Sequence, residues 1–256
     1  MLLRSLPANP TDGGMATALT LESLEASILA LSPRGWFDFS NPVYRVDSAG
    51  KCAQATDRSG NGFHLLQATG ANQPPVSANY WGSLNGVARD AIAFDGTTTI
   101  WMETAGNLFN GTTLWSFFCI QRPMGTAQST IFSTSNGSSV FSEVQLSSTQ
   151  MVFPGGGTGA TVNPPAMQAK QVAIGTYNYP GSGNVTTTLD INGVSGSLSF
   201  ALGSTAPGTS HLIIGVFGTG HSLKFNGLVS EIIMVPGVFD ANAIALLKQY
   251  AGFKYA

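Results

Sequence analysis

The chain has 256 residues, of which 9% are charged, and a formal net charge of −2. The 11 Lys and Arg residues are scattered singly, which excludes the clustered basic surface of a nucleic-acid-binding protein. No run approaches the roughly 20 apolar residues of a membrane span.

The first residues, Met1–Pro7, lack the apolar core and the cleavage site of a secretion signal. We therefore expect a protein made in the cytoplasm and kept there, or carried out as part of a larger particle. The two cysteines, Cys52 and Cys119, are too few for a disulfide framework and form no C-x-x-C pair. We expect two reduced, buried thiols, with one bridge as the alternative.

Residues 1–33 are predicted to form an arm that precedes the folded body. Met1–Leu19 is polar and lacks periodicity, which is typical of an extended segment. A short helix should follow over Thr20–Leu31, capped by Thr20 and ended by Pro33. Its apolar stripe either packs on its own domain or docks on a neighbouring subunit. The stripe consists of Leu21, Leu24, Ile28 and Leu31.

The next part of the chain shows turn signals between short β-like runs. Asp57–Gly62 is a dense turn signal. Asp95-Gly96 should join Ala91–Phe94 to Thr98–Glu103 as a hairpin, and Thr113–Gln121 should be a central strand.

The last third contains the clearest strand patterns. Apolar and polar residues alternate over Val185–Asn192, and Asn192-Gly193 then predicts a tight hairpin turn. Leu228–Val235 should be the central strand of a large sheet. A closing helix is expected from Asp240, its cap, to Ala251, with Gly252 ending it.

About a dozen strands at short spacing favour an all-β sandwich of two antiparallel sheets. Neither an internal repeat nor a break in composition divides residues 34–256, so we predict a single domain there.

These features resemble the concanavalin A-like jelly roll, in its laminin G-like branch, over about residues 34–256. The residues that carry the resemblance are Trp36-Phe37-Asp38, Asp57-Arg58-Ser59-Gly60-Asn61-Gly62, Asn85-Gly86, Ala93-Phe94-Asp95-Gly96, Asp190-Ile191-Asn192-Gly193, Ile213-Ile214-Gly215 and Phe225–Ile233. The resemblance implies two facing antiparallel sheets. Such modules occur in secreted sugar-binding proteins and in bacteriophage virion proteins, as capsid decorations or tail proteins.

No catalytic residue is predicted. Glycosidases of this fold carry two carboxylates close together on one strand. Among the glutamates only Glu22 and Glu25 are near each other, and both lie in the predicted N-terminal helix. Glu231 is expected to be a structural carboxylate held by backbone donors or a nearby cation.

The sequence gives little support for a metal or for histidine chemistry. His64, His211 and His221 have no zinc-ligand spacing. Lectins of this fold often hold calcium, and three carboxylates could converge for it, although they form no recognisable calcium loop. They are Asp38, Asp57 and Asp95, and each has a ready turn-capping role. We therefore predict no cofactor, with calcium as the alternative.

Aromatic side chains in loops are the best candidates for binding a ligand. Tyr80 and Trp81 lie in a loop rich in Gly, Asn and Pro, and are either a sugar platform, an anchor for a protein partner or locally packed. Trp101 and Trp115 lie in predicted strands and should belong to the core.

The first functional hypothesis is a non-enzymatic structural or adhesion subunit of a phage-like particle, located in the virion. It would be homo-oligomeric and attached to shell or tail proteins through residues 1–33. The alternative is a lectin-like module that binds cell-surface glycans.

Overall fold

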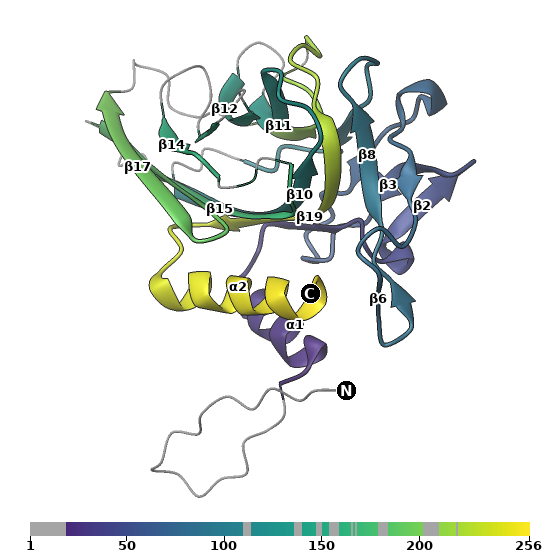
Figure 1. Ribbon diagram of the computed structural model, residues 1–256, viewed down its shortest axis with the longest axis horizontal. Helices are drawn as coiled ribbons and strands as arrows, with labels where there is room; N and C mark the ends of the chain where they lie inside the picture. Colours follow the sequence, from purple (N-terminus) through teal and green to yellow (C-terminus); the bar gives the residue numbers. More distant parts are fainter. Residues whose placement is uncertain are drawn as a thin grey trace, which may run out of the picture.

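The protein is a sandwich of two antiparallel sheets with two helices against the outer face of one of them (Figure 1). The structure is a computed structural model. It describes residues 19–109, 114–135, 140–146, 150–153, 159–164, 166, 168–178, 184–201, 210–218 and 220–256. Of the predicted arm over residues 1–33, residues 1–18 lie outside this range. The predicted all-β sandwich is confirmed.

Sheet A carries the helices, and β19 is its central strand. The strand order is β17 (Val194–Ala201), β16 (Asn184–Ile191), β15 (Gln171–Asn178), β10 (Leu114–Pro123), β19 (Asn226–Pro236), β8 (Ala91–Asp95) and β5 (Val76–Ser77), and β1 (Gly35–Asp38) also pairs with β19. β19 thus contacts three other strands, which confirms the prediction of a central strand over Leu228–Val235.

Sheet B faces sheet A and has no described α-helix on its outer side (Figure 1). Its order is β14 (Ala160–Val162), β13 (Met151–Phe153), β12 (Val140–Leu146), β11 (Ser129–Ser135), β18 (His211–Ile214), β9 (Met102–Thr104), β4 (Leu65–Leu66), β3 (Lys51–Ala55) and β2 (Arg45–Ser48). A separate hairpin pairs β6 (Ser83–Leu84) with β7 (Val87–Ala88).

Aromatic rings fill the space between the sheets. Phe117 of sheet A contacts Phe132 and Phe153 of sheet B edge to face, with ring centroids 4.9 Å apart in both pairs. Cys52 and Cys119 are buried and free, as predicted. Burial raises the pKa of the Cys52 thiol to about 12, so it stays protonated at neutral pH.

Both helices pack on the outer face of sheet A and on each other (Figure 1). α1 (Leu21–Ala30) starts at Thr20, which accepts a hydrogen bond from the Ser23 backbone N–H at 3.1 Å. Leu24 and Ile28 are buried in a cluster that includes residues of α2 (Ala241–Lys254) and sheet A. Leu24 and Ile28 thus pack on their own chain, with Leu21 and Leu31 partly buried against the same cluster. Docking of the stripe on a neighbouring subunit stays a prediction.

Two local predictions are wrong. Asp95-Gly96 does not close a hairpin, because β8 pairs within sheet A whereas β9 belongs to sheet B. The Asp95 carboxylate instead accepts hydrogen bonds from the backbone N–H groups of Thr97 and Thr98, and the chain crosses between sheets there. α2 also continues through Gly252 to Lys254, because Lys254 is held by buried carboxylates of the body.

Among the described residues, no helix has the length and apolar character needed to cross a membrane.

Because Gly252 lies inside α2, replacing it should stabilise the protein. A Cβ at this position would meet no atom within 4 Å. Gly252→Ala should therefore raise the free energy of unfolding by about 0.5–1 kcal/mol, since glycine loses more backbone entropy in a helix. Urea denaturation measures this. Destabilisation would contradict a helix that extends to Lys254.

Candidate functional site

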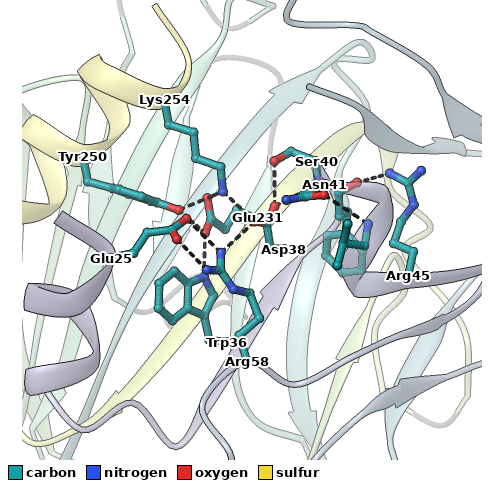
Figure 2. Close-up of polar contacts among 12 residues, drawn as sticks. Glu25, Trp36, Asp38, Ser40, Asn41, Arg45, Arg58, Glu231, Tyr250 and Lys254 are labelled. Atoms are coloured by element: carbon teal, nitrogen blue, oxygen red, sulfur yellow. Dashed lines mark hydrogen bonds and ion pairs between the residues drawn. The ribbon is translucent and has the colours of Figure 1, made fainter. Parts of the chain in front are cut away.

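The densest group of polar side chains lies between the helices and sheet A (Figure 2). At its centre is Glu231 of β19, which is fully buried. Its carboxylate accepts hydrogen bonds from Trp36 Nε1 at 2.6 Å, Tyr250 OH at 2.7 Å, Tyr255 OH at 2.7 Å and Lys254 Nζ at 3.0 Å. The predicted nearby cation is confirmed, and the remaining donors are side chains rather than backbone groups.

Ion pairs extend from Glu231 to both helices. The Lys254 ammonium also contacts Asp38 at 2.7 Å. Asp38 contacts Arg58 at 2.9 Å, and Arg58 reaches Glu25 of α1 at 2.7 Å. We call these five residues, Glu25, Arg58, Asp38, Lys254 and Glu231, the buried ion-pair cluster. It connects α1 and α2 with β1 and β19 (Figure 2).

The electrostatics of the cluster are those of a structural centre. Burial raises the pKa of the Glu231 carboxyl, and the Lys254 charge opposes this only in part. For Asp38, burial also favours the protonated form, but the charges of Lys254 and Arg58 outweigh it and the pKa lies below its ordinary value. The side chains of Asp38, Lys254 and Glu231 are at most 1% exposed, so no substrate reaches them.

Removing the shared ammonium should strongly lower the free energy of unfolding. Lys254→Met leaves Asp38 and Glu231 buried with one cation fewer, which we expect to cost about 3–5 kcal/mol of unfolding free energy. Urea denaturation at neutral pH measures this. Adding Glu231→Gln to Lys254→Met should recover part of the loss, because Asp38 keeps its ion pair with Arg58 whereas the Glu231 carboxylate has lost its ammonium partner.

The matched control is Lys248→Met on the same helix. Its ammonium pairs with Asp190 at 3.0 Å but is 40% exposed, so the loss should be at most about 1 kcal/mol. Equal effects of the two lysine variants would contradict a structural role for the buried ion-pair cluster.

A groove of about 400 Å³ lies on sheet B and on the loops beside it. Its volume is within the usual range for small-molecule sites, about 300–1,000 Å³. We call it the Trp101 groove. It is lined by Leu66, Gln67, Ala68, Thr69, Trp101, Glu103, Thr104, Ala105 and His211. Neighbouring strands supply its floor, because β4 pairs with β9 and β9 pairs with β18.

Polar groups and one large ring meet in the Trp101 groove. The partly exposed carboxylate of Glu103 pairs with His211 Nδ1 at 2.9 Å. Trp101 stacks on His221, with ring centroids 4.4 Å apart, and its buried Nε1–H has no hydrogen-bond partner among the described residues. Burial lowers the pKa of His221 more than the Glu103 charge raises it, so this imidazole is neutral at pH 7.

This site was not predicted from the sequence, because Trp101 was expected in the core. Trp115 is buried there as predicted, but Trp101 is only partly buried. The alternation of inward-facing and outward-facing residues around Trp101 could have revealed the site. Ile100 and Met102 are buried, which turns Trp101 and Glu103 toward the outer face of sheet B.

The predicted ligand residues Tyr80 and Trp81 lie elsewhere and make local contacts. Both rings are half-buried, and they meet edge to face with centroids 4.7 Å apart. Trp81 Nε1 donates to Ser230 Oγ, and Arg122 donates to the Tyr80 hydroxyl. These contacts fit the local-packing alternative, and a binding role for the two residues stays a prediction.

The three carboxylates considered for calcium do not converge. Asp38 is engaged by Lys254 and Arg58, Asp57 accepts the backbone N–H groups of Trp36, Ser59 and Phe63, and Asp95 caps its own turn. Within the described ranges, no three His, Cys, Asp or Glu side chains are grouped as metal ligands would be.

Solved structures resemble this chain in fold. An arabinofuranosidase complexed with arabinofuranosyl-alpha-1,2-xylobiose superposes with a TM-score of 0.66 at 12% identity, over 90% of this chain and 65% of that protein. A Trypanosoma rangeli sialidase superposes with a TM-score of 0.58 at 13% identity, over 96% of this chain and 35% of that protein. The botulinum neurotoxin type G receptor binding domain superposes with a TM-score of 0.53 at 8% identity, over 85% of this chain and 50% of that protein.

At these identities the comparisons show the fold alone, which is the concanavalin A-like sandwich predicted above. The chain spans about two thirds or less of each of these proteins. No family model and no curated protein matches the sequence.

Proposed function

We propose that this chain is a non-enzymatic carbohydrate-binding module that holds a glycan in the Trp101 groove. The observation that carries the proposal is the partly exposed Trp101 ring beside Glu103 and His211, in an open groove on the sheet that bears no described α-helix. Sugars present apolar C–H faces and hydroxyl groups, so a site for them combines an aromatic face with a few polar side chains.

Each polar group has a role in this proposal. Glu103 accepts hydrogen bonds from sugar hydroxyls, and His211, oriented by Glu103 and by the Thr104 carbonyl at 3.0 Å, offers its other ring nitrogen.

The same residues argue against hydrolysis. Retaining and inverting glycosidases need two carboxyl groups on either side of the scissile bond, separated by about 5–9.5 Å. Among the described residues that line the Trp101 groove, a single one, Glu103, carries a carboxylate. The carboxylates of Asp38 and Glu231 do converge on Lys254, but they are sealed beneath the helices.

A glycan array followed by calorimetry tests the proposal. The fold neighbours described above include an arabinofuranosidase complexed with arabinofuranosyl-alpha-1,2-xylobiose and a sialidase. The array should therefore hold arabinoxylan oligosaccharides, sialosides and bacterial polysaccharides. We expect saturable binding without product release.

Trp101→Ala should weaken that binding by about tenfold or more, because the aromatic contact is worth on the order of 1.5 kcal/mol. Trp81→Ala is the matched control and should leave the affinity unchanged. Loss of binding in Trp81→Ala but not in Trp101→Ala would move the site to the Tyr80–Trp81 loop. A blank array across all classes would count against carbohydrate binding.

The hypothesis of a phage-like structural or adhesion subunit stays a prediction. It rests on the low charge and on the arm, and an adhesion subunit could itself carry a glycan-binding body. Since Leu24 and Ile28 are buried within the chain, attachment to a particle would depend mainly on residues 1–18.

A further inference from the structure

β17 forms one edge of sheet A, and no strand in the described part of the chain pairs with its outer side. It pairs with β16 in unbroken register from Val194 to Ala201. Its sequence, Val-Ser-Gly-Ser-Leu-Ser-Phe-Ala, contains neither a charged residue nor proline. Edge strands usually carry such residues or a bulge, because a bare edge recruits another strand.

The other described edges are protected. β5 and β14 are short, with two and three residues. β2 carries Arg45 and Asp47 and has a break in register between Val46 and Asp47. β17 is therefore the long, regular and uncharged edge among the strands described.

The geometry of its hairpin fixes which backbone groups face outward. Asn192 and Gly193, with φ of 52° and 88°, form a two-residue turn, and Val194 pairs with Ile191 across it. The backbone groups of the two residues that flank such a turn form hydrogen bonds with each other. Along the strand, the N–H and C=O groups of successive residues then point alternately toward the paired strand and away from it. The N–H and C=O groups of Ser195, Ser197 and Ser199 consequently point to the free edge.

We propose that β17 pairs antiparallel with β17 of a second copy of this chain, with the two-fold axis at Ser197. The strand is complementary to itself in this register. Ser195 lies opposite Ser199 of the other copy, so the face on the helix side becomes a row of serines. On the other face the small Gly196 lies opposite Leu198. An interface of this kind presents the same patch from both copies, as a closed dimer requires.

Exposed apolar side chains on β17 support pairing with a second copy of this strand. Val194 and Leu198 are 40% and 39% exposed. A groove of about 550 Å³ lies on the helix side of the same strand, between α2 and the end strands, and it is lined by Ser195, Ser197, Val238 and Ile244 among others. A partner strand with the same uncharged sequence would cover the edge without burying an unpaired charge.

Sedimentation equilibrium of the full chain, with a matched pair of variants, tests the proposal. The wild type should be a dimer at micromolar concentration. Ser197→Lys should weaken dimerisation by about tenfold or more, because it places two ammonium groups opposite each other at the axis. Ser83→Lys introduces the same charge on the β6–β7 hairpin and should have no effect. A monomeric wild type, or a Ser197→Lys variant that dimerises as well as Ser83→Lys, would overturn the proposal.

Cysteine cross-linking tests the register. Ser197→Cys should form a disulfide-linked dimer under mild oxidation, because directly opposed residues have Cα atoms about 4.5–5.5 Å apart. Ser199→Cys alone should not, since its own counterpart would lie about 14 Å away along the strand. A mixture of Ser195→Cys and Ser199→Cys should cross-link. The native Cys52 and Cys119 are buried and do not interfere. Efficient linking of Ser199→Cys to itself would overturn this register.

Discussion

The arrangement of the molecule depends on the ammonium of Lys254, which lies between the carboxylates of Asp38 and Glu231 at 2.7 and 3.0 Å. A buried carboxylate is costly unless it is paired and hydrogen-bonded, so we expect the positions of β1 and β19 to depend on the cation that α2 supplies. Arg58 makes the corresponding connection to Glu25 of α1. The charges thus select one placement of the two helices, on the outer face of sheet A.

That placement separates the two faces of the sandwich. The outer face of sheet A is covered by helices, and its polar cluster is sealed from solvent. Sheet B bears no described α-helix on its outer face and carries the Trp101 groove, where an aromatic ring, a carboxylate and an imidazole meet. In the proposed dimer the paired β17 edges would unite two such modules. A dimer with two grooves would bind a repetitive glycan more tightly, because binding in the first groove raises the effective concentration of glycan at the second.

Local turn chemistry was predictable from the sequence, and contacts between distant segments were not. Asn192-Gly193 was predicted as a tight turn, because such a turn needs positive φ at both residues. Both residues have positive φ in the structure. Asp95-Gly96 gave the same local signal, yet its flanking strands belong to different sheets, which only long-range pairing decides. Gly252 resembled a helix end, but the buried partners of Lys254 extend the helix past it. The Trp101 groove was missed because a strand tryptophan was assumed to be core, although the buried residues on either side of it place it on the outer face.

The central claim is that ligand binding occurs at Trp101. The protein has four tryptophans, so four indole N–H signals should appear in a proton–nitrogen NMR spectrum, each assignable by substitution. During titration with a glycan selected on the array, the account predicts that the Trp101 signal shifts saturably while those of Trp36, Trp81 and Trp115 stay in place. A saturable shift of the Trp81 signal with Trp101 unmoved would contradict it.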